Sequence, residues 1–175
     1  MTRILKLILA DCNAVVLPDS IVDLTSLIDL HITDNKLSCL PDNIGNLHSL
    51  VSLYVNTNRI THLPDSIGCL SSLTHLYVNI NQLTCLPESI GNLSKLTNLD
   101  VGYNLLTHIP YSVCNLKSLR SLHLHNNQLT RLPDSIRNMS SLRELYVSDN
   151  PITSTPSGKD DVNRRFGRAG FYLIV

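Results

Sequence analysis

Apolar residues recur along this chain with a fixed period of 23 residues. The repeats align with one another without an insertion when their first residues are Ile4, Leu27, Leu50, Leu73, Leu96, Leu119 and Leu142. Within each repeat, apolar residues occupy the first, fourth and sixth positions, as Leu50, Leu53 and Val55 do. Because spacing of two is typical of a strand with one buried face, the pattern predicts a short strand at the start of each of seven repeats, the last one partial.

A column of asparagines follows the predicted strands. Its members are Asn35, Asn58, Asn81, Asn104, Asn127 and Asn150, and Cys12 takes this place in the first repeat. A buried side-chain amide can donate to backbone carbonyls and accept from backbone amides at the same time. We therefore expect each asparagine to bond the peptide groups of the turn that leaves the sheet.

A column of prolines marks the second half of each repeat. It consists of Pro18, Pro41, Pro64, Pro87, Pro110, Pro133 and Pro156. Proline starts helical turns well, and apolar residues follow three and six positions later, as Ile67 and Leu70 do. Spacing of three favours a short 3₁₀ or irregular segment. Since no single coil can bury its leucines alone, the coils must stack.

The repeat resembles that of the leucine-rich-repeat family. The family's Leu-x-x-Leu-x-Leu-x-x-Asn-x-Leu core is matched by Leu73, Leu76, Val78, Asn81 and Leu83. The resemblance covers about residues 4–156, and the end of each repeat, such as residues 86–93, is similar to the intracellular Ras-group subclass and to bacterial members.

This resemblance implies an α/β fold and a class of function. The implied fold is a curved, horseshoe-shaped solenoid with a parallel β-sheet on the concave face and short 3₁₀ or irregular turns on the convex face. Residues 1–156 would form the repeats, and residues 157–175 a C-terminal cap or tail. The relatives implied are scaffolds or adaptors, and they include bacterial effectors that act in host cells.

Strand side chains between the buried leucines should point onto the concave face, which is unusually rich in Tyr, His and Asn. Tyrosine offers a large contact area at low entropic cost, so we expect a protein-binding surface. The alternative is that the tyrosines only cover their cross-strand neighbours. Gly102 is expected to leave a shallow depression there. The expected partner-binding residues are His31, Tyr54, Asn56, His75, Tyr77, Asn79, Asn98, Asp100, His123, His125 and Tyr146.

Two histidines and a carboxylate on this face suggest a zinc site. His123 and His125 share a strand face, and Asp100 lies one strand before them. Histidine is also a common polar strand residue, and no fourth side chain closes the coordination sphere. A role as general acid and base lacks a nucleophile or an enclosed pocket. The sequence therefore predicts no metal, no cofactor and no enzyme activity.

Composition narrows the classes of partner and compartment. Lys plus Arg and Asp plus Glu both number 14, so no net field favours nucleic acid or anionic lipid. No run reaches the roughly 20 apolar residues of a membrane span, and residues 1–3 lead into the repeats without a signal peptide. Five scattered cysteines favour reduced thiols, and with them a cytoplasmic protein.

The two ends of the chain differ from the repeats. The first predicted strand is strongly apolar and has an open edge, through which the N-terminal repeat could pair with a second copy of the chain. Residues 157–166 have a helical pattern, with Asp160 and Arg164 four positions apart, which favours a capping helix over a disordered tail. The apolar residues 171–175 complete this cap or contact a partner.

These features together predict a protein–protein interaction module that acts as an adaptor or scaffold in signalling. The alternative is a bacterial effector, or the recognition portion of one, in the cytoplasm of a host cell. A metal-dependent enzyme and a self-assembling structural solenoid are the less favoured interpretations.

Overall fold

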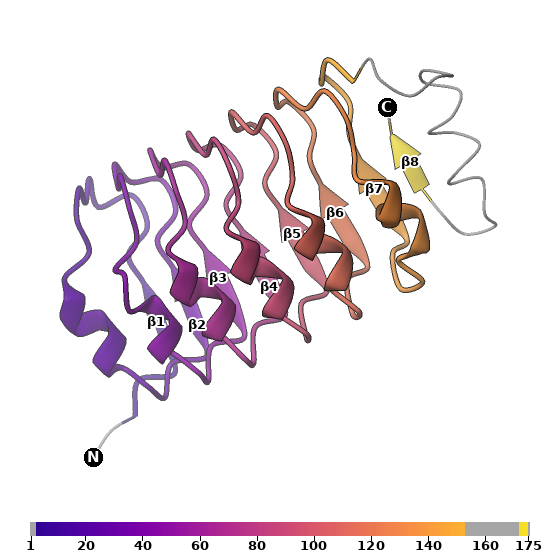
Figure 1. The fold of residues 1–175 in the computed structure, drawn as a ribbon. Coiled ribbons are helices and arrows are strands. Elements are labelled where there is room, and N and C mark those ends of the chain that lie inside the picture. The colour runs from indigo at the N-terminus through magenta and orange to yellow at the C-terminus, as the bar shows by residue number, and fades with distance from the viewer. Residues whose placement is uncertain (1–2, 153–171, 175) are drawn as a thin grey trace.

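The computed structural model describes residues 3–152 and 172–174 of the chain. Within them, eight strands form one open parallel sheet whose strand order follows the chain (Figure 1). The strands are β1 (Lys6–Ile8), β2 (Asp29–His31), β3 (Ser52–Tyr54), β4 (His75–Tyr77), β5 (Asn98–Asp100), β6 (Ser121–His123), β7 (Glu144–Tyr146) and β8 (Tyr172–Ile174).

In the sheet from β1 to β7, each strand residue pairs with the residue 23 positions later in the chain. The framework leucine of each strand pairs with the equivalent leucine of the next, as Leu53 does with Leu76 and Leu76 with Leu99. Because the register never slips from β1 to β7, every repeat places the same position on the same face. The expected α/β solenoid with a concave parallel sheet is confirmed.

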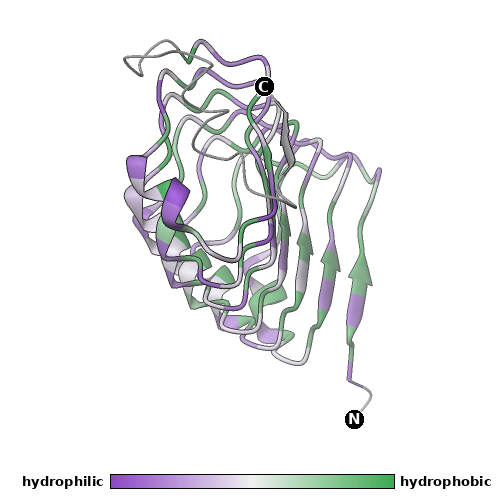
Figure 2. Ribbon diagram, turned by 90° about the vertical axis from the view of Figure 1, so that its right-hand side faces the viewer, coloured by the Kyte–Doolittle hydropathy of each residue, from purple (hydrophilic) through white to green (hydrophobic). Residues whose placement is uncertain are grey.

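Six short 3₁₀ helices line the opposite, convex side (Figure 2). They are η1 (Asp19–Asp23), η2 (Ile44–Asn46), η3 (Asp65–Cys69), η4 (Glu88–Asn92), η5 (Tyr111–Asn115) and η6 (Asp134–Asn138). Five of them begin directly after a proline of the predicted column, and η2 begins after Asn43 instead. The proline column therefore does set the start of most turns.

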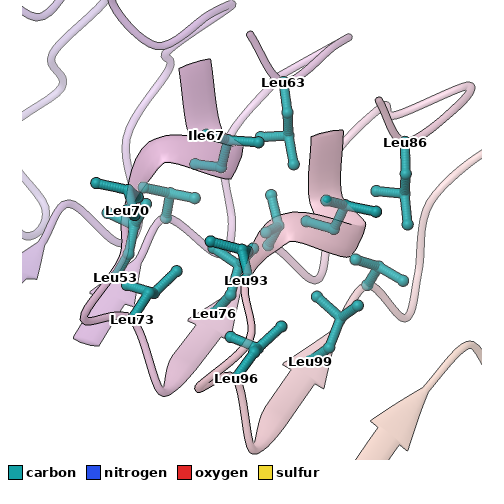
Figure 3. Close-up of a cluster of buried hydrophobic side chains, with 14 of the residues drawn as sticks. Leu53, Leu63, Ile67, Leu70, Leu73, Leu76, Leu86, Leu93, Leu96 and Leu99 are labelled. Atoms are coloured by element: carbon teal, nitrogen blue, oxygen red, sulfur yellow. The ribbon is translucent and has the colours of Figure 1, made fainter. Parts of the chain in front are cut away.

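The core fills the space between sheet and turns (Figure 3). Leu53 and Leu76 from the strands meet Ile67 and Leu70 from η3 and its end, and all four side chains are 0% exposed. Burying a leucine of this kind stabilises the fold by about 2 kcal/mol. Because the contacts run between neighbouring coils, a repeat depends on the one before and the one after it.

The asparagine column bonds consecutive repeats together. In the third repeat, the Asn58 Oδ1 accepts from the amide of Leu37 at 3.0 Å. Its Nδ2 donates to the carbonyls of Ile32 at 2.8 Å and Val55 at 3.1 Å. Leu37 and Ile32 belong to the preceding repeat, so the predicted use of both sides of the amide is confirmed and extends across the repeat boundary.

The residue just before each asparagine has a left-handed backbone. Positive φ angles of 51–56° occur at Asp34, Thr57, Ile80, Tyr103, Asn126 and Asp149. This turn geometry was not predicted from the sequence. It is unfavourable for a β-branched side chain such as that of Ile80, and the asparagine bonds hold the chain there.

The two ends of the sheet carry different features. β8 extends the sheet by pairing with β7, with Tyr172 beside Glu144, in a segment for which the sequence predicts only a cap or tail. The expected capping helix at 157–166 lies outside the described residues. At the other end, Ile8 is 59% exposed on β1, and self-association there stays a prediction. Among residues 3–152 and 172–174, no helix is long and apolar enough to span a membrane.

Candidate functional site

The concave face gathers the expected partner-binding residues in three columns, at the first strand position, at the last strand position and two residues beyond the strand. Neighbours in one column include His31 beside Tyr54, Tyr54 beside Tyr77, and Asp100 beside His123. All eleven predicted residues are half-buried, with their backbones held by the sheet and part of each side chain open to solvent. Their placement on one surface agrees with the strand periodicity.

Three rings in the N-terminal half of this face form a continuous stack. The ring centroids of His31 and Tyr54 lie 4.2 Å apart with an interplanar angle of 18°. Those of Tyr54 and Tyr77 lie 4.9 Å apart at 7°. Stacked rings at this spacing attract one another beyond their burial. The tyrosines therefore do cover their cross-strand neighbours, and they also present a row of ring edges and hydroxyls. We call these residues the aromatic stack.

Burial and nearby charge keep two members of the aromatic stack uncharged near neutral pH. Burial lowers the pKa of the His31 imidazole, and the Lys6 ammonium lowers it further while Asp29 opposes the shift. Burial raises the pKa of the Tyr77 phenol, and Tyr54 and Asp100 raise it further. This part of the face offers hydrogen-bonding groups without net charge.

The C-terminal half of the face holds a polar cluster of Asp100, His123 and His125. The Asp100 Oδ2 lies 3.6 Å from the His123 Nδ1. The Asp100 Oδ1 accepts a 2.9 Å hydrogen bond from the amide of Gly102, which fixes the carboxylate. The rings of His123 and His125 have centroids 6.0 Å apart. We call these three residues the Asp–His cluster.

The depression expected at Gly102 is not open, and that expectation was wrong. A Cβ atom added to Gly102 would lie 2.4 Å from the His125 Cε1, so the imidazole already fills the space above the glycine. The Tyr103 ring packs edge-on against His125 with centroids 5.1 Å apart. The glycine therefore accommodates a side chain of this protein and leaves no hollow for one from a partner.

Comparison with known proteins places this architecture in a family. A family model described as a leucine-rich repeat region matches residues 75–158. A leucine-rich-repeat protein of Leptospira interrogans has a solved structure that is 36% identical, with a TM-score of 0.77 over 79% of this chain. The chain is a leucine-rich-repeat protein.

A second solved structure supports the same assignment. An internalin from Listeria monocytogenes is 31% identical to this leucine-rich-repeat protein, with a TM-score of 0.73 over 85% of the chain. The chain spans 35% of the Leptospira structure and 43% of the internalin structure. No curated protein matches it.

A basic groove that was not predicted from the sequence lies at the edge of the leucine-rich-repeat sheet where the strands begin. The cationic side chains of Lys95, Lys117 and Arg120 line this groove together with Thr74, Thr97, Ser118 and Ser141. No carboxylate lines the groove among the described residues. Three basic residues in the segments before β5 and β6 indicate this groove, but the net charge of the whole chain is zero and gives no hint of it.

The five cysteines of the leucine-rich-repeat protein are all free thiols. Four are exposed, whereas Cys114 on η5 is half-buried. Burial raises the pKa of the Cys114 thiol, and a hydrogen bond with Ser135 opposes the shift. Cys69, at the end of η3, is one of the exposed thiols. None of the described residues joins these thiols into a disulfide.

Proposed function

We propose that this leucine-rich-repeat chain is a protein-interaction module that binds a protein partner on its concave face, as an adaptor or scaffold. The observation that carries the proposal is the aromatic stack. Three half-exposed rings are aligned on a sheet whose register is the same in every repeat from β1 to β7. Family membership supports the general class, since such repeats typically serve as interaction modules without catalysis.

The physical advantage of this surface is preorganisation. A tyrosine held in a stack loses little side-chain freedom when a partner covers it, so more of the contact energy contributes to affinity. Burying such an aromatic anchor at the centre of an interface is worth about 2 kcal/mol or more. Tyr54 and Tyr77 are the residues we expect to contribute most.

The basic groove adds an electrostatic preference. Lys95, Lys117 and Arg120 form no ion pair with a carboxylate among the described residues. A partner that crosses the concave face and carries acidic side chains over this edge would therefore associate faster at low salt. The five free thiols fit a reducing compartment, which supports the cytoplasm as the place of action.

A bacterial effector, or the recognition portion of one, is the second candidate. The similar solved structures come from the bacteria Leptospira interrogans and Listeria monocytogenes, which favours this candidate. The same concave face would then bind a protein inside a host cell. The two candidates share one site, so the source of the captured partner separates them.

The experiment is affinity capture followed by titration. The parent chain and a Tyr54→Ala, Tyr77→Ala variant are used as baits in lysate from the native host, and in eukaryotic host lysate if the source is bacterial. Tyr111→Ala is the matched control, because Tyr111 is 66% exposed on η5, away from the sheet. Circular dichroism confirms that each variant folds.

The identified partner is then titrated against all three chains. We expect the double variant to bind at least tenfold more weakly than the parent and Tyr111→Ala to match the parent. Equal affinity of the parent and the double variant would reject the concave face as the binding site.

A further inference from the structure

We propose that Asp100, His123 and His125 form a binding site for a divalent transition-metal ion such as zinc on the concave face. One ligand atom from each of the three residues lies within 4.8 Å of the other two. Two imidazoles and a carboxylate are ligands that zinc accepts. This inference is independent of the protein-binding proposal, because it concerns the chain alone with a metal ion.

The spacing between Asp100 and His123 fits two ligands of one ion. Their Oδ2 and Nδ1 atoms are 3.6 Å apart, too far for a hydrogen bond. Two ligands at about 2.0–2.1 Å from a tetrahedral ion lie about 3.4 Å from each other. An ion between them therefore needs only a small adjustment of either side chain.

The hydrogen bonds around His123 select the imidazole tautomer that a metal requires. The Ser121 hydroxyl donates to the Glu144 Oε2 at 2.8 Å. A hydroxyl has one proton, so the bond of 2.9 Å between the Ser121 Oγ and the His123 Nε2 must be donated by the imidazole. In the neutral ring the Nδ1 then carries a lone pair that faces the Asp100 carboxylate.

The hydrogen bonds from His123 to Ser121 and from Ser121 to Glu144 resemble those that usually orient metal-binding histidines. A ligating imidazole commonly donates its second N–H to a group that is itself hydrogen-bonded, which orients the ring. Here Ser121 is 5% exposed, and it links His123 to the Glu144 carboxylate. In this tautomer an acceptor atom of Asp100 and an acceptor atom of His123 face each other at 3.6 Å, as two ligands of one cation would.

His125 supplies the third ligand, and one of its ring nitrogens has no hydrogen bond to another described residue. Its Nδ1 is buried and has no hydrogen-bond partner among the described residues. Buried polar atoms are normally satisfied, and an ion or water is one explanation when they are not. The ring is held from two sides, by the bare backbone of Gly102 and by the edge-on Tyr103.

The site is accessible from the concave face. The side chains of His123 and Asp100 are 30% and 16% exposed, so an ion can enter without local unfolding. Three protein ligands leave a fourth position for water or for a group of a partner. A hollow of about 40 Å³, lined by Tyr77, Asn98 and Ser121 together with Asp100 and His123, lies beside the cluster.

The first test is calorimetric titration of Zn²⁺ into the full chain after chelator treatment. The parent is compared with a His123→Ala, His125→Ala variant and with a His62→Ala, His108→Ala control. The control loses the same number of imidazoles outside the cluster, and all three chains keep the five thiols. We expect the cluster variant to lose one binding event, or to bind at least tenfold more weakly, while the control matches the parent.

Two further measurements do not depend on the folding of the double variant. On Zn²⁺ titration of the parent, the imidazole nitrogen resonances of His123 and His125 should shift while that of His62 stays in place. Ser121→Ala should weaken binding about 10–100-fold and alter the tautomer of His123. Equal titration curves for parent and cluster variant, or zinc shifts that bypass both histidines, would overturn the site.

Discussion

The side-chain oxygen of Asn81 accepts a 2.9 Å hydrogen bond from the backbone amide of Ile60, which lies in the preceding repeat. The Nδ2 of the same asparagine donates to the carbonyls of Val55 and Val78, each at 3.0 Å. With a longer bond of 3.4 Å to the carbonyl of Asn79, one buried amide thus contacts four backbone groups, two of which belong to another coil. The stacking of repeats depends on these polar bonds as well as on leucine burial.

Replacing Asn81 by alanine should lower the free energy of unfolding by about 2–4 kcal/mol, because buried backbone groups lose their partners. Urea denaturation followed by circular dichroism measures this change. Asn79→Ala is the matched control, since Asn79 lies two residues away on the concave face and is half-buried. Its effect should stay within about 0.5 kcal/mol. Similar losses in the two variants would contradict the role given to the asparagine column.

Replacing Ile80 by asparagine should stabilise the protein. Ile80 has a φ angle of 56° and is 47% exposed, so the exchange removes a backbone strain and little buried surface. We expect a gain of about 1 kcal/mol in the free energy of unfolding. Asn126→Ile makes the reverse exchange at the equivalent place and should cost at least as much, because it also removes the hydrogen bond from the Asn126 Nδ2 to the Asp149 Oδ2. Thermal denaturation of both variants tests the sign, and a loss of stability in Ile80→Asn would refute the argument.

Gly102 and His125 should be energetically coupled. A methyl group at position 102 must displace the imidazole that lies over it, so Gly102→Ala should cost more in the parent than in a His125→Ala background. A double-mutant cycle of unfolding free energies should give a coupling of about 0.5–2 kcal/mol. Additive effects would mean that the ring does not occupy this place in solution.

The His31 imidazole should titrate below its ordinary pKa of 6.5, because burial and the Lys6 ammonium both disfavour its charged form. Between the folded pKa and 6.5 the unfolded chain then binds more protons than the folded chain. The stabilising contribution of neutral His31 is therefore complete above pH 6.5 and is lost as the pH falls through the folded pKa.

Two measurements test this titration. Nuclear magnetic resonance should place the His31 midpoint below 6.5, and Lys6→Gln should raise it. In denaturation experiments, His31→Gln should lose less stability than the parent as the pH falls below 6.5. A His31 midpoint above that value would reverse the predicted slope.

The sequence predicted the repeat framework because every repeat must bury apolar residues at the same positions. Leu53, Leu76 and Leu99 occupy one place in the period, and one pleat direction follows for all of them. The asparagines and prolines act through backbone chemistry that their residue types already specify. Each repeat thus served as an independent test of the same pattern.

The left-handed turn residues escaped prediction because their side chains have no common chemistry. Asp34, Thr57, Ile80 and Tyr103 share only a backbone conformation, which the neighbouring bonds impose on them. β8 was not predicted for a different reason. Tyr172 pairs with Glu144, and the two are separated by more residues than one repeat period.

The membership of the concave face followed from strand alternation, but its detailed arrangement did not. Whether Tyr54 stacks on Tyr77, and whether His125 turns over Gly102, depends on side-chain rotamers that packing decides. The tautomer of His123 depends in turn on the serine and glutamate beside it. These are properties of pairs of residues, and no single position carries them.

Because the register is constant, such a chain can change its length by whole repeats. Each asparagine bonds backbone groups 21 and 26 positions earlier, so its partners are defined by counting along the chain. Deleting or duplicating residues 73–95 would join equivalent surfaces and leave every remaining partner in place, whereas removing one residue would misalign all later coils with the earlier ones. Unequal recombination between repeats can therefore lengthen or shorten the recognition surface without a new core, and the natural unit of variation is the whole turn of the solenoid.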